Sequence, residues 1–127
     1  MTEKKYKIFI LEDEPELADI FTSILKKCGF QVESANNGKT ALEKIKRFKP
    51  DLSLLDLVVP EVDGYEVIEA LRKDDAMKDS LIYAFSNLTQ KDEVDRARKM
   101  GADGYLIKSD YTPNKLLDKV REILNNK

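Results

Sequence analysis

Histidine is absent from the 127 residues of this chain, and its absence excludes several kinds of chemistry. Without histidine, the chain can form neither a Ser-His nor a Cys-His catalytic pair. It also cannot carry a phosphohistidine or bind zinc through imidazole. Any chemistry must therefore use carboxylates, hydroxyls, lysines and the backbone.

The chain also has only one cysteine, no excess of basic residues and no long apolar run. Cys28 stands alone, so neither an internal disulfide nor a cysteine metal cluster can form. The formal net charge is −2 with acids and bases interleaved, whereas nucleic-acid binding needs a clustered basic excess. The first apolar run, Ile8 to Leu11, is too short for a signal or membrane segment. We expect a cytoplasmic protein without direct nucleic-acid contact or membrane insertion.

The composition that is present predicts one folded domain. Apolar residues make up 42% of the chain and charged residues 36%, enough for a core and a solvated surface. The length fits a single domain, which we expect to span residues 1–127 without an output domain.

Strand-like and helix-like patterns alternate five times, which predicts an α/β fold with a doubly wound parallel sheet and helices on both faces. The expected strands are residues 8–11, 30–32, 52–59, 81–85 and 105–107. The expected helices carry apolar residues at helical spacing over residues 17–28, 41–48 and 67–71, and two more follow, one over 89–100 and one from 112 to about 126.

Several residues mark the ends of these helices. Pro15 suits a first helical turn and Gly29 a helix stop. Thr89 followed by Asp92 resembles a capping box for the fourth helix, and Thr112 is placed to cap the last one. The first helix is expected to bury one apolar face, made of Leu17, Ile20, Phe21, Ile24, Leu25 and Cys28.

Polar side chains follow four of the five apolar runs. In a parallel sheet, ligands bind outside the carboxyl ends of the strands, so these side chains should meet in one shallow crevice. Three carboxylates, a hydroxyl and a lysine suit a hard cation together with a phosphoryl group. The residues are Glu12, Asp13, Asp56, Ser86 and Lys108.

Most of these residues also have an ordinary structural interpretation. Acids before a helix are favoured by its dipole, a serine often forms a turn, and most lysines are simply solvated. Asp56 differs, because an acid inside the run Leu54 to Val59 is costly to bury unless it is paired or bound to metal. Their shared position at one edge of the sheet favours a functional site.

The residue types support one reaction. Asp13 and Asp56 can hold Mg²⁺ (or Mn²⁺), with Glu12 acting mostly through a bound water. Asp56 can then attack phosphorus and form an aspartyl phosphate. Lys108 and Ser86 can supply charge and hydrogen bonds to the phosphoryl oxygens.

The chain resembles the response-regulator receiver family over essentially its whole length, and four segments carry the resemblance. They are Ile10 to Pro15, Ala35 to Leu42, Leu54 to Gly64 and Gly101 to Lys108. The resemblance implies a flavodoxin-like sheet with strand order 2-1-3-4-5 and five helices, a strand order that also occurs in a chemotaxis receiver. It also implies that a histidine kinase or histidine phosphotransfer protein donates the phosphoryl group to Asp56.

Further roles follow from the same resemblance. The backbone carbonyl of Val58 would be a metal ligand, and Ser86 and Tyr105 would form a coupled switch. The switch would alter a surface around the fourth helix, fifth strand and fifth helix that binds a downstream protein. The chain would be a monomer or a phosphorylation-dependent dimer. It would dephosphorylate itself slowly without being a turnover enzyme. Tyr105 would look the same in sequence if it were only a partly buried strand aromatic.

Two positions depart from the family pattern. Ser109 follows Lys108 where the family usually has proline, so we expect no cis peptide bond there. Asn87 follows Ser86 where many relatives have a smaller residue, so we expect it to alter access to Asp56 and the lifetime of the phosphorylated state. Comparing dephosphorylation with that of Asn87→Ala tests this.

Two other functions stay open at this point. The chain could be a receiver-like module that binds a partner without being phosphorylated. It could also be a small hydrolase with an aspartyl-phosphate intermediate. Hydrolases of the haloacid dehalogenase type place a second Asp two positions after the nucleophile, where this chain has Val58, which has no proton to exchange.

Overall fold

The computed structural model describes residues 5–126, which contain one five-stranded parallel sheet. The strands are β1 (Lys7–Leu11), β2 (Gln31–Ala35), β3 (Leu52–Leu55), β4 (Leu81–Ser86) and β5 (Gly104–Ile107). Their order in the sheet is β2-β1-β3-β4-β5, and every neighbouring pair is parallel. The predicted strand order is confirmed.

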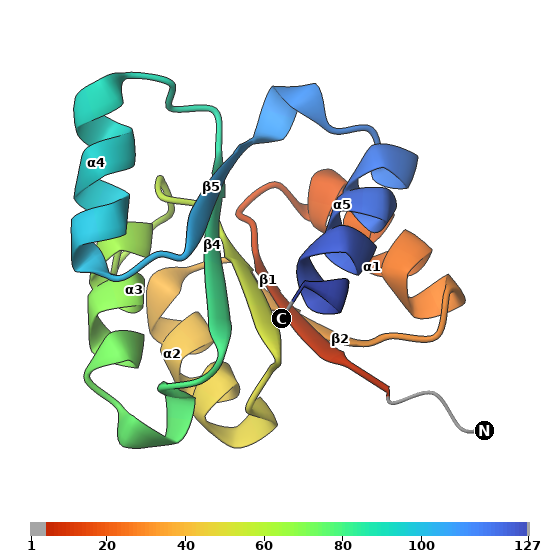
Figure 1. The fold of residues 1–127 in the computed structure, drawn as a ribbon, viewed down its shortest axis with the longest axis horizontal. Coiled ribbons are helices and arrows are strands. Elements are labelled where there is room, and N and C mark those ends of the chain that lie inside the picture. The colour runs from red at the N-terminus through yellow and green to blue at the C-terminus, as the bar shows by residue number, and fades with distance from the viewer. Residues whose placement is uncertain (1–4, 127) are drawn as a thin grey trace.

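Helices cover both faces of the sheet. The α-helices are α1 (Pro15–Lys27), α2 (Gly38–Phe48), α3 (Gly64–Arg72), α4 (Lys91–Met100) and α5 (Pro113–Asn125), with short 3-10 helices η1 (Asp75–Met77) and η2 (Lys108–Asp110). Figure 1 shows α1 and α5 on one side of the sheet and α2, α3 and α4 on the other. No helix within residues 5–126 is long and apolar enough to cross a membrane.

Two apolar layers fill the space between the sheet and its helices. Successive side chains of a strand point to opposite faces. In β1, Ile8 and Ile10 pack in the layer under α1 and α5, and Phe9 and Leu11 pack in the layer under α2 and α3. Burial on both faces explains why the central strands are continuous apolar runs without polar alternation.

The expected third strand is shorter than its apolar sequence suggests. β3 ends at Leu55, and the chain then leaves the sheet at Asp56. Leu57 is buried, but the side chain of Val58 is 61% exposed. The run to Val59 is therefore partly a loop, because the chain must turn at the carboxyl edge of the sheet before α3.

One predicted helix cap is wrong and one is confirmed. The capping box at Thr89 and Asp92 does not form, because α4 begins after Gln90, which makes no side-chain cap hydrogen bond. Thr112 does cap α5, since its hydroxyl accepts the Lys115 N–H at 3.2 Å.

The buried face of α1 is narrower than its apolar pattern predicts. Phe21 and Leu25 are buried, whereas Ile20 is 48% exposed and Cys28 is exposed. The helix contacts the sheet and α5 along one stripe, and apolar residues on its flank stay in solvent.

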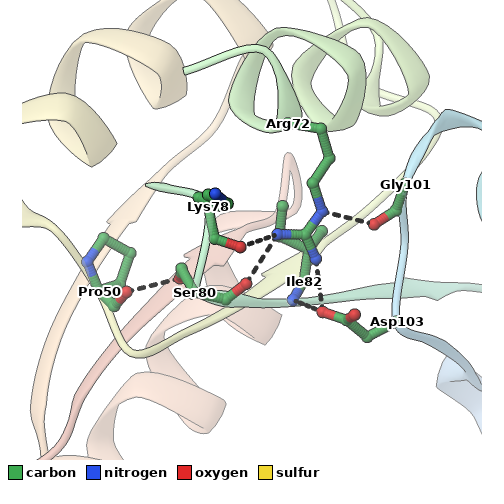
Figure 2. A network of polar contacts seen from close by, with 7 residues as sticks. All are labelled: Pro50, Arg72, Lys78, Ser80, Ile82, Gly101 and Asp103. Atoms are coloured by element: carbon green, nitrogen blue, oxygen red, sulfur yellow. Dashed lines mark hydrogen bonds and ion pairs between the residues drawn. The ribbon is translucent and has the colours of Figure 1, made fainter. Parts of the chain in front are cut away.

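The guanidinium of Arg72 ties together three segments near the amino ends of β4 and β5, as Figure 2 shows. Its Nε donates to the carbonyl of Gly101 at 2.7 Å, and one terminal nitrogen donates to the carbonyl of Ser80 at 2.9 Å. The other terminal nitrogen pairs with Asp103 at 2.5 Å, and the same carboxylate oxygen accepts the Ile82 N–H at 2.9 Å. We call this set the Arg72 clasp.

Removing the clasp should destabilise the fold. We expect Arg72→Met to lower the free energy of unfolding by about 1–2 kcal/mol. The effect is limited because the Asp103 side chain is 39% exposed, and solvent screens its ion pair with Arg72. Lys73→Met is the matched control, because the Lys73 side chain is 74% exposed and its ammonium lies 3.7 Å from Glu69, so its loss should cost less than about 0.5 kcal/mol. Urea unfolding measures both, and equal effects would contradict the clasp.

Candidate functional site

The carboxyl ends of the strands bring the predicted residues together. Glu12 directly follows β1, Asp56 follows β3, Ser86 ends β4 and Lys108 follows β5. These ends lie toward the top of Figure 1, away from the Arg72 clasp. Glu12, Asp56 and Ser86 are each at most 5% exposed, so three polar groups are buried at one edge of an apolar sheet.

The ammonium of Lys108 lies between two carboxylates. Its Nζ is 2.6 Å from Oδ2 of Asp56 and 2.5 Å from Oε1 of Glu12. The second oxygen of Glu12 accepts the backbone N–H of Glu14 at 3.0 Å. These contacts compensate in part for burying two anions side by side.

Burial shifts the titration of both partners. Burial raises the pKa of Glu12, and the hydrogen bonds from Lys108 and the Glu14 amide offset this only in part. Burial by itself would lower the pKa of Lys108, but its hydrogen bonds to Asp56 and Glu12 and their charges outweigh that effect and raise it. Lys108 is therefore a permanent cation at neutral pH.

Three carboxylates at this edge could hold a metal ion. One oxygen from each of Glu12, Asp13 and Asp56 lies within 4.8 Å of the others, and Asp13 is exposed to solvent. A single lysine cannot neutralise three carboxylates, so the cluster favours a further cation. Oxygen ligands with an open, hydrated side match the requirements of Mg²⁺.

A loop behind Asp56 fixes the position of this residue. The Val58 N–H donates to Oδ1 of Asp56 at 3.1 Å, and the Gly64 N–H donates to the carbonyl of Leu57 at 3.2 Å. A Cβ atom at Gly64 would lie 2.2 Å from the backbone oxygen of Asp56. Glycine is therefore required where α3 begins, because the backbone of Asp56 passes directly against it.

Ser86 and Tyr105 both contact the loop between β4 and α4. The Leu88 N–H lies 3.5 Å from the Ser86 hydroxyl, and the Tyr105 hydroxyl donates to the Leu88 carbonyl at 2.6 Å. Burial raises the pKa of Tyr105, which a hydrogen bond with Ser86 partly offsets. The two residues are thus linked through one loop, while their role as a switch stays a prediction.

Two further contacts near the site were not predicted from sequence. The Tyr65 hydroxyl donates to the carboxylate of Glu93, and the Arg96 guanidinium lies 3.9 Å from the centre of the Tyr65 ring, so α3 is joined to α4. Burial raises the pKa of Tyr65, and the hydrogen bond to Glu93 raises it further. Tyr65 and Ile68 have apolar helical spacing, which predicts burial but not these polar partners.

The second unpredicted contact joins the two positions that depart from the family pattern. Oδ1 of Asn87 accepts the backbone N–H of Ser109 at 2.7 Å. Every peptide bond described in residues 5–126 is trans, which confirms the expectation for the bond after Lys108.

Comparisons with known proteins agree with this geometry. The family model described as the response regulator receiver domain matches residues 8–121. The chain is 34% identical over 121 residues to the alkaline phosphatase synthesis transcriptional regulatory protein PhoP of Bacillus subtilis, covering 93% of this chain and 48% of that protein. It is 33% identical over 121 residues to a probable transcriptional regulator of Porphyridium aerugineum, covering 95% of this chain and 49% of that protein. The chain therefore spans about half the length of the curated relatives it matches.

Solved structures are similar over almost the whole chain. The CheY-like response regulator receiver domain protein of Methanospirillum hungatei superposes with a TM-score of 0.88 at 26% identity, covering 97% of this chain and 96% of that one. The BeF3-activated N-terminal receiver domain of Klebsiella pneumoniae RstA gives a TM-score of 0.81 at 32% identity, covering 91% and 95%.

The crowding at Gly64 gives a test of the loop behind the site. We expect Gly64→Ala to lower the free energy of unfolding by about 1–3 kcal/mol, because the added methyl group would displace the backbone of Asp56. Glu69→Ala on the same helix removes only a solvent-exposed ion pair with Lys73 and should cost less than about 0.5 kcal/mol. Urea unfolding of both variants is the measurement, and a Gly64→Ala protein as stable as wild type would show that the loop tolerates displacement.

Proposed function

Because this chain belongs to the response regulator receiver family, we propose that it accepts a phosphoryl group on Asp56 in a reaction that depends on a divalent cation. The observation that carries the proposal is the contact of a buried Asp56 carboxylate with the Lys108 ammonium, inside a cluster of three acids. A buried carboxylate that lies beside a cation and beside oxygen atoms able to bind a metal can act as a nucleophile toward phosphorus.

The side chains support a simple sequence of events. A carboxylate oxygen of Asp56 forms a bond to phosphorus while the bond from phosphorus to the donor's leaving group breaks, and the leaving group keeps that electron pair. Mg²⁺ held by Glu12, Asp13, Asp56 and the Val58 carbonyl would neutralise charge as the anionic donor approaches. Lys108 and the Ser86 hydroxyl would then bind phosphoryl oxygens.

The modified state would act through a protein surface. Tyr105 and Ser86 contact the loop that leads into α4. A movement of Ser86 toward the phosphoryl group would therefore change the surface formed by α4, β5 and α5. We propose that a downstream protein binds there. Phosphoryl transfer to water would return the chain slowly to its starting state without turnover of an external substrate.

A shallow apolar groove on α1, the helix that follows Glu12 and Asp13, supports a protein as the donor. The groove runs along α1 and reaches the start of α5, and the exposed Ile20 lies in it. A small exposed apolar patch on a helix suits docking of a helical partner. We propose that the partner is a histidine kinase or histidine phosphotransfer protein.

Phosphorylation of Asp56 is tested with acetyl phosphate and Mg²⁺. We expect intact mass spectrometry to show one added phosphoryl group on wild type and on Asp118→Asn, whose parent side chain is exposed on α5, and none on Asp56→Asn. No addition on wild type would favour the unphosphorylated binding module. Repeated turnover of a phosphate ester would favour the hydrolase.

Cation binding is tested by thermal unfolding. At a Mg²⁺ concentration ten times its dissociation constant, we expect a gain of about 1.4 kcal/mol, or roughly 4–6 °C in Tm. Asp13→Asn should lose most of this gain, whereas Asp118→Asn should keep it. An equal gain in both variants would place the cation elsewhere.

The same gain should depend on pH in a defined direction. Burial raises the pKa of Glu12, so this carboxyl gains its proton at a pH above its ordinary value of 4.5. A protonated Glu12 no longer attracts a cation, so the Mg²⁺-dependent increase in Tm should shrink as the pH falls, beginning above pH 4.5. An increment that stays constant down to that pH would exclude Glu12 from the cation site.

A further inference from the structure

Asn87 and Ser109 form a bond between the two loops that carry the phosphoryl-binding residues. Oδ1 of Asn87 accepts the Ser109 N–H at 2.7 Å. Asn87 directly follows Ser86, and Ser109 directly follows Lys108, so each residue of the bond is next to a residue of the site. The strands before them are neighbours, with Ser86 opposite Ile107.

The segment that begins with Lys108 is held at its other end as well. Helix η2 closes with the Tyr111 N–H donating to the Lys108 carbonyl at 3.1 Å. The Tyr111 ring then packs edge-on against Phe85, 6.2 Å away between ring centres. Phe85 lies in β4 one residue before Ser86, so Phe85 and Asn87, on either side of Ser86, contact the η2 segment at two points.

The first N–H groups of a short helix have no partner within it. The Ser109 N–H is such a group, and Asn87 supplies its acceptor from another loop. Where the family usually has proline after the lysine, this position has no N–H to donate. The two departures of this chain therefore match each other: Ser109 provides a donor, and Asn87 provides a side chain long enough to accept from it.

We propose that Asn87 is a positioning residue that holds the backbone at Ser109 and so aims the Lys108 ammonium at Asp56 and Glu12. The inference rests on the proposed function, because Lys108 matters only if Asp56 is the phosphoacceptor. In this proposal Asn87 acts through its amide oxygen, an effect distinct from the predicted influence of its bulk on access to Asp56. The two effects can be separated by substitutions that change one property at a time.

Three variants make that separation. Asn87→Leu keeps the approximate size of the side chain and removes the acceptor. Asn87→Asp keeps an acceptor oxygen at the same position. Ser109→Ala keeps the backbone N–H and removes only an exposed hydroxyl, so it is the matched control. Asn87 and Ser109 are both exposed, so each variant should unfold within about 0.5 kcal/mol of wild type.

The first measurements need no phosphoryl donor. Amide hydrogen exchange by NMR reports the Ser109 N–H, and the NMR signal of the Lys108 ammonium reports its ion pairs through its exchange with water. We expect faster Ser109 exchange and a weakened Lys108 signal in Asn87→Leu. Wild-type behaviour is expected in Asn87→Asp and Ser109→Ala. An unprotected Ser109 N–H in wild type, or an unchanged Lys108 signal in Asn87→Leu, would overturn the inference.

The rate of phosphorylation by acetyl phosphate completes the test. We expect Asn87→Leu to be about two- to fivefold slower than Ser109→Ala, the range that the loss of one exposed hydrogen bond allows. Equal rates would overturn the positioning role. If wild type accepts no phosphoryl group at all, the proposed function fails, and the NMR measurements still decide whether Asn87 holds Lys108.

Discussion

The ammonium of Lys108, held between the carboxylates of Glu12 and Asp56, is the contact on which the rest of the site depends. Two buried acids at neighbouring strand ends repel each other, and burial raises the pKa of Glu12. One lysine relieves this repulsion only in part, because Asp13 adds a third carboxylate. The remaining negative charge explains why the crevice suits a metal ion.

The amino ends and the carboxyl ends of the strands have different roles. At the amino ends of β4 and β5, the Arg72 clasp satisfies backbone carbonyls and joins loops, which serves stability. At the carboxyl edge, the polar groups are buried and imperfectly neutralised, and the chain leaves β3 at Asp56 in a loop that is packed against Gly64. Functional sites commonly break the rules of burial that the rest of a fold obeys.

Much of the fold was predictable because local patterns and the parallel sheet leave few alternatives. The apolar run at Ile8 predicted a strand buried on both faces, and Thr112 predicted the start of α5, as observed. Predictions failed where surroundings outweighed local sequence: Thr89 does not cap α4, and Ile20 is exposed although it continues an apolar stripe. Neither failure could be read from the local pattern, because α4 begins after Gln90 and Ile20 lies outside the buried stripe of α1.

By itself, the sequence determined which groups stand at the strand ends, because an apolar run followed by a polar residue fixes where a buried strand meets solvent. It thereby placed Glu12, Asp56, Ser86 and Lys108 at one edge. Only the tertiary structure decided which of them touch, that Lys108 pairs with Glu12 as well as Asp56, and that Asn87 bonds to Ser109. Such contacts join residues far apart in the chain, and a single hydrogen bond between loops leaves no periodic trace in the sequence.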